Sequence, residues 1–320
     1  MDAHAHGSAS FSWKADSFPK PSAYTVGLDS DLSKAYEEVR RGRGFVVIRG
    51  LPIDGSLENF IDAVRALGNR FGHLLSQNAQ GEMVGQVLDA TAEDPTPRMY
   101  RSNLELRPHN DITAMISLAC WHKSQSGGAS MIVSAVAVHD EIRRRSPRLL
   151  EPLYRGYHYH RLGEEGADEE PTTPYRTPVF AVRDGQLSCR YQRAGIAAGH
   201  RERGVPLAGE DIEALNLFDE VAKAPENRLS FYLERGDMIV INNYTVMHAR
   251  TEFRNFPEPE RQRRLIRLWL DAPGFRDVPP EFRLFPAANG VPRQAGKRAS
   301  FDFRKLYAED PVASGGMPKL

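Results

Sequence analysis

The segment that decides the expected fold is Arg235-Gly-Asp-Met-Ile-Val-Ile-Asn-Asn-Tyr-Thr-Val-Met-His248. Its Arg-Gly-Asp start is a turn signal, and the apolar run from Met238 to Asn242 predicts a buried strand. A histidine, His248, stands shortly after that strand. A single histidine behind an apolar segment is usually a core residue, so its meaning depends on what the rest of the chain supplies.

Short strands of the same kind are predicted on both sides of this segment. Residues 179–182 and 187–191 flank an Asp184-Gly185 turn, which is typical of a β-hairpin. Residues 131–138 begin as a strand and are expected to become helical near His139. Other apolar runs bounded by Gly, Pro and Asn indicate strands at 114–121, 229–233 and 265–270.

Helices are predicted mainly ahead of the strands. Apolar positions follow helical spacing from Leu32 to Val39 and from Leu57 to Phe71, and a buried strand at 45–48 separates the two. A third helix is expected over 209–224. This inventory predicts an α+β protein that is mainly β, a sandwich or barrel with flanking helices. A jelly roll is one pair of sheets that can enclose a metal in this way.

The length of 320 residues suits one large domain or two small ones, and 41% apolar residues provide a substantial core. No repeat or low-complexity linker interrupts the middle, so we predict a single domain over residues 23–275. Residues 1–22 are expected to form a flexible arm. The Pro/Gly-rich segment 276–320 is expected to be a tail that packs on the domain or is partly disordered.

Charge and cysteine content narrow the classes of function. Lys+Arg and Asp+Glu number 42 each, so the chain as a whole has no electrostatic footprint for nucleic acid. The two cysteines, Cys120 and Cys189, are isolated, which predicts reduced core thiols rather than a disulfide framework or zinc knuckle. The sequence has no apolar signal peptide and no membrane span, so we expect a cytoplasmic protein. It does not exclude that the protein forms a homo-oligomer.

The pair His109-x-Asp111 gives His248 a chemical context. Residues i and i+2 of a strand point to the same face, so both side chains can reach one ion. Two imidazoles and one carboxylate form the facial triad that leaves half of an iron's coordination sphere open. The pair alone is weak evidence for a metal site, because a surface histidine beside a solvated aspartate gives the same pattern.

Arginines in an apolar strand strengthen this interpretation. Arg263 and Arg267 lie in a run that is otherwise apolar, and their spacing places both on one face of a strand. A guanidinium binds a carboxylate bidentately, so an anion is expected beside them. Arg264 directly precedes Leu265-Ile266-Arg267 and could bind the anion instead, but strand alternation favours Arg263, which shares a face with Arg267. The alternative is a pair of arginines at a strand edge that form ion pairs with Asp271 or Glu260.

These residues resemble the taurine dioxygenase and clavaminate synthase-like family of Fe(II)/2-oxoglutarate-dependent dioxygenases. The matching elements occur in the family's order over roughly residues 30–272, most of the chain. They are Gly44 to Gly50, Pro108-His109-Asn110-Asp111, Gly127-Gly128-Ala129-Ser130, Arg235 to His248, and Arg263-x-x-x-Arg267. Each element is ordinary alone, and the five in order are specific. The resemblance implies a double-stranded β-helix (jelly roll) core with flanking helices.

The resemblance also implies the cofactors and their ligands. His109, Asp111 and His248 would bind Fe(II), and Arg263 would pair with the distal carboxylate of 2-oxoglutarate. Ser130 would donate a hydrogen bond to that carboxylate, although the family more often has Thr there. Dioxygen would be the oxidant, and 2-oxoglutarate would be decarboxylated to succinate. Hydroxylation of an unactivated C–H bond is the usual outcome, and desaturation or cyclisation stays open.

Pointers to the substrate are fewer. Gln77 and Asn78 resemble the loop that lines the substrate side in clavaminate synthase-like enzymes. Arg267 would lie near the substrate, and Arg190 and Arg193 would add positive charge. This combination suits a small anionic or zwitterionic molecule, such as an amino acid or organic acid. For Arg190 and Arg193, ordinary surface charge is the alternative.

Two other functions compete with an oxygenase. A non-catalytic metal- or ligand-binding protein on the same scaffold would have no use for the carboxylate anchor at Arg263. A zinc hydrolase would use the same three ligands around a bound water, but it needs a general base. No HExxH or equivalent helix motif is present in the sequence.

Overall fold

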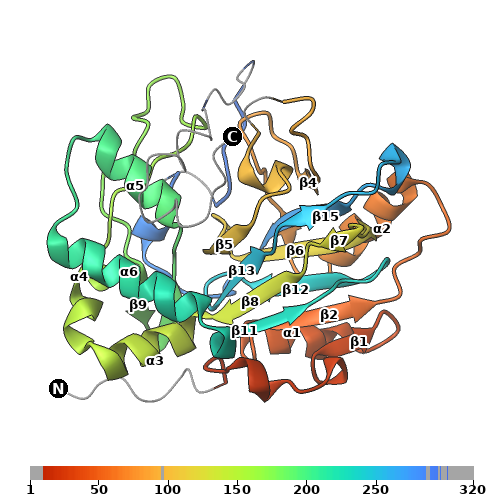
Figure 1. Cartoon of the computed structure of the whole chain (residues 1–320), viewed down its shortest axis with the longest axis horizontal. Coiled ribbons are helices and arrows are strands. Elements are labelled where there is room, and N and C mark those ends of the chain that lie inside the picture. Colours follow the sequence, from red (N-terminus) through yellow and green to blue (C-terminus); the bar gives the residue numbers. More distant parts are fainter. Residues whose placement is uncertain (1–9, 95–96, 286–288, 295, 297–300, 302–320) are drawn as a thin grey trace.

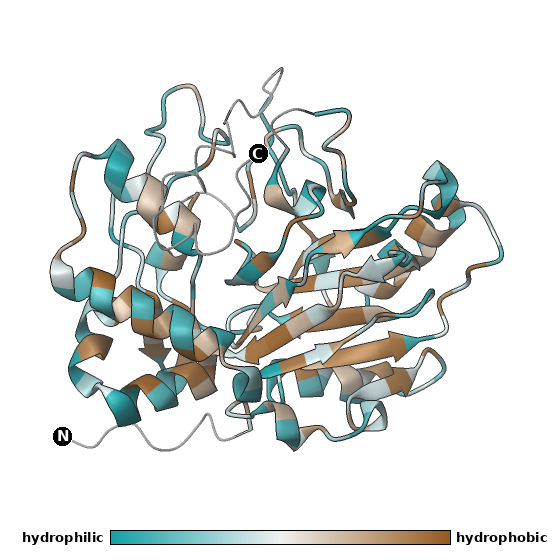
Figure 2. Cartoon of the chain, in the orientation of Figure 1, coloured by the Kyte–Doolittle hydropathy of each residue, from teal (hydrophilic) through white to brown (hydrophobic). Residues whose placement is uncertain are grey.

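The computed structural model describes residues 10–94, 97–285, 289–294, 296 and 301. Figure 1 shows a half that is rich in strands beside a half that is mainly helical. Figure 2 shows that the central strands are largely hydrophobic, whereas the helices carry hydrophilic residues toward the outside. The helices of the second half are α3 (Ala135–Arg145), α4 (Leu150–Arg155), α5 (Arg193–Glu202) and α6 (Gly209–Lys223).

The larger sheet has the strand order β1-β2-β12-β6-β15-β3, with β4 also paired to β15. Its pairings are antiparallel apart from β1 with β2, which is parallel. The strands are β1 (Thr25–Gly27), β2 (Phe45–Arg49), β3 (His73–Leu74), β4 (Val84–Val87), β6 (Met115–His122), β12 (Met238–Asn242) and β15 (Arg264–Asp271).

The smaller sheet is antiparallel, with the strand order β11-β8-β13-β5. The chain crosses from β12 in the larger sheet to β13 in the smaller one, and this crossing carries His248 to the second sheet. The strands are β5 (Leu106–His109), β8 (Ser130–Ser134), β11 (Arg228–Phe231) and β13 (Val246–Arg250). Two separate pairs are β9 (Phe180–Arg183) with β10 (Gln186–Cys189), and β7 (Ser126–Gly127) with β14 (Phe253–Arg254).

Two helices, α1 (Leu32–Arg40) and α2 (Leu57–Gly68), cover the outer face of the larger sheet. Their buried residues share a core cluster with the sheet residues Val240, Ile266 and Leu268. The N-cap side chains Asp31 and Ser56 each accept a backbone N–H of the first turn, which satisfies donors that a helix start leaves unpaired. At Gly68 a Cβ would lie 2.4 Å from Leu268 Cδ1, so glycine allows α2 to pack closely on β15.

The predicted elements recur with small shifts of their ends. The helices at 32–39, 57–71 and 209–224, the strand at 238–242 and the hairpin around Asp184-Gly185 are all present. In the segment 131–138 the helix starts earlier than expected, at Ala135, because the Ser134 hydroxyl accepts the N–H of Ala137. Sequence patterns missed α5. It contains Gly199, where a Cβ would lie 2.4 Å from the His158 carbonyl oxygen.

The expectation of a flexible arm at 1–22 is wrong for the part that the structure describes. Phe11 and Trp13 are buried in the main core, and the Trp13 indole donates to the Arg43 carbonyl at 2.8 Å. Burial of two large aromatic side chains stabilises the fold and fixes this part of the N-terminal segment on the core. The remaining residues of the predicted arm, 1–9, lie outside the described residues.

The described part of the C-terminal segment packs on the domain. Phe282, Leu284, Phe285 and Val291 are buried. Residues 286–288, 295, 297–300 and 302–320 of the predicted tail lie outside the described residues. Short 3₁₀ helices occur at Ala15–Ser17, Pro21–Ala23, Met99–Arg101, Pro147–Leu149, Pro225–Asn227, Pro259–Arg261 and Pro280–Phe282.

Two further expectations concern cysteines and membranes. Cys120 and Cys189 are buried and free, as the isolated positions predicted. Within the described residues, no helix has the length and apolar character needed to span a membrane.

Candidate metal centre and substrate cavity

The structure brings His109, Asp111 and His248 together at one end of the smaller sheet. His109 ends β5 and lies directly across from His248 in β13, and their ring centroids are 4.3 Å apart. Asp111 Oδ1 is 3.8 Å from His109 Nε2, and Asp111 Oδ2 is 4.0 Å from His248 Nε2. One ligand atom from each residue lies within 4.8 Å of the others, so a single ion can contact all three.

Hydrogen bonds orient these side chains from behind. His109 Nδ1 lies 2.8 Å from the Arg107 carbonyl oxygen, which directs Nε2 toward Asp111. Asp111 Oδ2 accepts the Trp269 indole N–H at 2.8 Å and Arg267 Nη1 at 3.2 Å. The Asn243 amide donates to the Asp111 carbonyl, and its Oδ1 accepts the Asp111 N–H.

Electrostatics keep the triad in the form that binds a cation. Burial opposes ionisation of Asp111, but Arg267, the two histidines and the Trp269 N–H outweigh it and lower the pKa of this carboxyl to about 2. Burial, together with the nearby His109, lowers the pKa of His248 to about 3. Near neutral pH the site therefore offers a carboxylate and a neutral imidazole, the forms that ligate metals. Two nitrogens and one oxygen in this arrangement fit a divalent iron.

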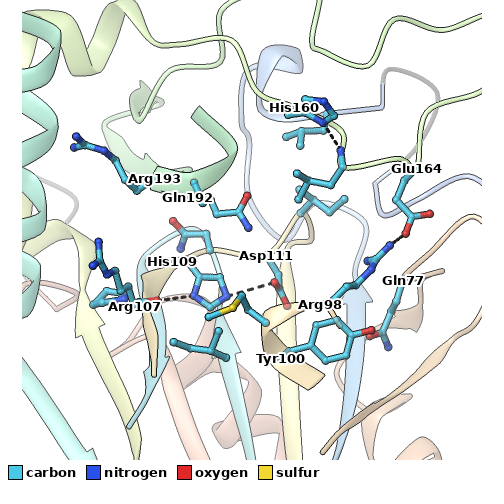
Figure 3. Close-up of a pocket in the computed structure, with 18 of the residues that line it drawn as sticks. Gln77, Arg98, Tyr100, Arg107, His109, Asp111, His160, Glu164, Gln192 and Arg193 are labelled. Carbon is cyan, nitrogen blue, oxygen red and sulfur yellow. Dashed lines mark hydrogen bonds and ion pairs between the residues drawn. The ribbon is translucent and has the colours of Figure 1, made fainter. Parts of the chain in front are cut away.

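A cavity of about 270 Å³ opens beside His109 and Asp111 (Figure 3). His109 and Asp111 line it, with the arginines Arg98, Arg107, Arg161, Arg193 and Arg267 and the carboxylates Glu105, Glu164, Asp219 and Glu252. Its apolar wall includes Leu104, Leu106, Ile112, Leu162, Trp269, Leu284, Phe285 and Val291. The described C-terminal segment thus contributes directly to this wall.

Arg267 lines the cavity and is held by several contacts. Its Nε donates to Gln77 Oε1 at 2.8 Å, and the Gln77 amide donates back to the Arg267 carbonyl at 2.9 Å. The guanidinium carbon is 4.2 Å from the Tyr100 ring centroid and 5.1 Å from that of Trp269. Gln77 and Arg267, both expected near the substrate, therefore form one unit beside Asp111.

Two other arginines of the cavity are paired with cavity carboxylates. Arg98 forms an ion pair with the buried Glu164, and Figure 3 shows these two side chains facing each other. Arg193 Nη1 lies 3.7 Å from Asp219, whose other oxygen accepts the Tyr191 hydroxyl at 2.7 Å. Arg193 therefore lines the cavity, but its charge is shared with a buried carboxylate.

Two residues expected near the substrate do not line the cavity. Asn78 binds Glu82 through its side chain and accepts the N–H of Gln80, so it stabilises its own loop. Arg190 is buried and donates to the Asp111 carbonyl, with Tyr244 and Phe282 next to its guanidinium. Arg190 thus contacts the backbone of the segment that carries Asp111, on the side away from the cavity lining.

The expected co-substrate residues lie next to the same sheet. Arg263 is 4% exposed, and burial lowers the pKa of its guanidinium to about 10. Its neighbour Arg264 is only partly buried. Gly128 has φ +72°, and a Cβ there would lie 3.1 Å from Arg263 Nε, so the Gly-Gly turn makes room for this arginine. Ser130 lies across from Arg250 in the β8–β13 pairing.

Sequence reasoning missed several residues around the triad. Trp269 shares a strand face with Arg267, so its two-residue spacing was a signal that it could reach Asp111. Arg98, Tyr100 and Glu164 lie in loops without a recognisable pattern. Only tertiary packing places them at the cavity.

Comparisons with known proteins show which family the chain resembles. A family model described as "Taurine catabolism dioxygenase TauD, TfdA family" matches residues 12–269. The FR-33289 synthase of Streptomyces rubellomurinus (strain ATCC 31215) is 29% identical over 255 residues, which cover 78% of this chain and 75% of that protein.

Two solved structures share the fold. An asparagine oxygenase in complex with Fe(II), 2S,3S-3-hydroxyasparagine and succinate has a TM-score of 0.58 and 17% identity, covering 77% of this chain and 93% of that one. The non-heme iron oxygenase OrfP in complex with Fe and alpha-ketoglutaric acid has a TM-score of 0.54 and 12% identity, covering 74% of this chain and 78% of that one.

Proposed function

Because this chain belongs to the taurine catabolism dioxygenase TauD, TfdA family, it is an Fe(II)/2-oxoglutarate-dependent dioxygenase, and we propose that it oxidises a small anionic or zwitterionic molecule. Amino acids and organic acids are the substrate class, and hydroxylation or desaturation of an unactivated C–H bond is the reaction. The family assignment favours a dioxygenase over the two competing interpretations, a non-catalytic binding protein and a zinc hydrolase.

We propose that the two main sheets form a double-stranded β-helix, or jelly roll. The order of the strands supports this proposal, because the chain alternates between the sheets. It passes from β5 in the smaller sheet to β6 in the larger, back to β8 and β11, then through β12, β13 and β15. A chain wound in this way leaves the metal-binding residues at one open end of the sheet pair.

In this proposal His109, Asp111 and His248 hold Fe(II), while Arg263 and Ser130 bind the distal carboxylate of 2-oxoglutarate. The bound iron and co-substrate, with dioxygen, supply the oxidising chemistry. The protein contributes orientation: Trp269 and Arg267 fix the Asp111 carboxylate, and the Arg107 carbonyl fixes the tautomer of His109. The burial of Arg263 favours it over Arg264 as the anchor, since a buried guanidinium requires an anion.

The observation that carries the substrate class is the position of Arg267. Arg98 and Arg193 are paired with Glu164 and Asp219, whereas the carboxylate next to Arg267 is the metal ligand Asp111. Arg267 both contacts Asp111 and lines the cavity, so it brings a positive charge to the cavity wall directly beside the proposed metal site. The remaining carboxylates of the cavity also suit a substrate that carries an ammonium group.

A turnover assay tests this substrate class. Amino acids and carboxylic acids would be compared with their methyl esters, which keep the carbon skeleton but lack the negative charge, and succinate release would be measured. We expect the acids to stimulate succinate release and the esters to leave it near the uncoupled level. Equal stimulation by acids and esters would contradict the proposal. A separate measurement of Fe(II) binding shows whether the protein carries its metal in the assay.

A further inference from the structure

Two buried arginines face the same phenyl ring next to the metal centre. The guanidinium carbon of Arg250 lies 4.7 Å from the centroid of Phe253, and that of Arg263 lies 4.9 Å from it. Both arginines are 4% exposed. Arg263 is the expected anchor of 2-oxoglutarate, whereas neither the sequence motifs nor the proposed function gives a role to Arg250.

The hydrogen bonds of these arginines are incomplete. Arg250 Nη2 donates to the carbonyls of Ser102 and Leu104, but its Nε and Nη1 are buried without a partner. Arg263 Nη1 is also buried without a partner. In the described part of the chain, no carboxylate forms an ion pair with either arginine. Two like charges buried together cost folding free energy unless an anion compensates them.

Strand register places Arg250 on the side of the sheet that holds the metal ligands. Arg250 follows His248 by two residues in β13, so the two side chains share a face. Its direct partner across the β8–β13 ladder is Ser130, which shares that face as well. Ser130 and Arg250 therefore lie at the same end of the smaller sheet. Arg263 directly precedes β15 of the larger sheet and comes close to Arg250 at the Phe253 ring, which both guanidinium groups contact.

We propose that Arg250 is a second guanidinium of the co-substrate site and binds the distal carboxylate of 2-oxoglutarate together with Arg263. This inference rests on the proposed function, which places that carboxylate at Arg263. An ionised carboxylate has two oxygens with about four acceptor positions, enough for both guanidinium groups and the Ser130 hydroxyl. The site therefore selects 2-oxo acids that carry a second carboxylate.

Binding measurements on the iron-loaded protein test this proposal. Calorimetry without oxygen would compare 2-oxoglutarate with 2-oxobutyrate, which has the same chelating 2-oxo acid head but no distal carboxylate. In Arg250→Ala we expect 2-oxoglutarate to bind about 10–100-fold more weakly, the effect of losing hydrogen bonds to a charged group. Binding of 2-oxobutyrate should change less than about twofold, since Arg250 does not contact its head group.

Matched variants separate this role from a purely structural one. Arg254→Ala removes an exposed arginine of β14 and should leave both affinities unchanged. Arg250→Lys keeps a positive charge and serves if the alanine variant does not fold. It should bind 2-oxoglutarate with intermediate affinity, because lysine lacks the planar fork.

The possible outcomes are distinct. If Arg250→Ala weakens 2-oxoglutarate and 2-oxobutyrate equally, Arg250 only supports the loop at Ser102 and Leu104, and the inference is overturned. An unchanged affinity for 2-oxoglutarate overturns it too. If Arg263→Ala loses 2-oxoglutarate while Arg250→Ala does not, the proposed function stands and only the second guanidinium fails. If the wild-type protein does not bind 2-oxoglutarate, the proposed function fails as well.

Discussion

The indole N–H of Trp269 provides a sharp test of how the metal centre is held. Trp269→Phe removes the 2.8 Å hydrogen bond to Asp111 Oδ2 but keeps an aromatic ring at a position that is 5% exposed. Arg267 still contacts the same oxygen at 3.2 Å, so the carboxylate stays ionised. The variant therefore changes the orientation of one metal ligand without changing its charge.

The size of the effect follows from that single bond. A hydrogen bond to a charged group contributes about 1.5–3 kcal/mol, and about 1.4 kcal/mol corresponds to a factor of ten in affinity. We expect Fe(II) to bind about 10–100-fold more weakly, which is the usual effect of removing a partner of a metal ligand. Competition with a fluorescent chelator under anaerobic conditions measures this affinity.

The matched control is Trp13→Phe. This change also removes an indole hydrogen bond, the one to the Arg43 carbonyl, but in the core near the N-terminus. It should lower the free energy of unfolding by about 1 kcal/mol and leave Fe(II) affinity unchanged. The reasoning is refuted if Trp269→Phe binds Fe(II) within twofold of the wild type, or if Trp13→Phe loses as much affinity.

Three further outcomes are expected. Fe(II) at about 100 times its Kd should stabilise the folded protein by about 2.7 kcal/mol and raise its Tm in a calorimetric scan. His109→Ala should abolish this rise in Tm. A rise that persists in the variant would place the metal elsewhere. Phe11→Ala should lower the free energy of unfolding by about 3–5 kcal/mol in urea titrations, because Phe11 is buried in the core; a neutral result would show that the arm is dispensable. Burial raises the pKa of Cys120 to about 12, so iodoacetamide should not modify it in the native protein at pH 8 but should do so in denaturant, as mass spectrometry would show.

Local patterns in the sequence determined most of the fold and half of the site. Helical spacing gave α1, α2 and α6, and apolar runs between turn residues gave β6, β12 and β15, because these signals depend only on near neighbours. The two-residue spacing of His109 and Asp111 predicted that both could reach one ion, but β5 ends at His109, so contacts of the following loop, such as those with Asn243, position Asp111. His248 and Arg263 were identified from ordered motifs, although nothing local showed that they would meet the first pair.

Only the tertiary structure decided which charged groups face the cavity. Arg190 and Arg193 looked alike in sequence, yet packing directs Arg190 behind the triad and pairs Arg193 with Asp219. Phe11 lies in a segment expected to be flexible, and Phe285 lies in the C-terminal tail that was expected to pack on the domain or to be partly disordered. Both are buried because distant strands and helices offer them an apolar surface. The direction of a side chain is set by contacts between residues that are far apart in the chain. Sequence spacing therefore identified the ligands, and packing determined what surrounds them.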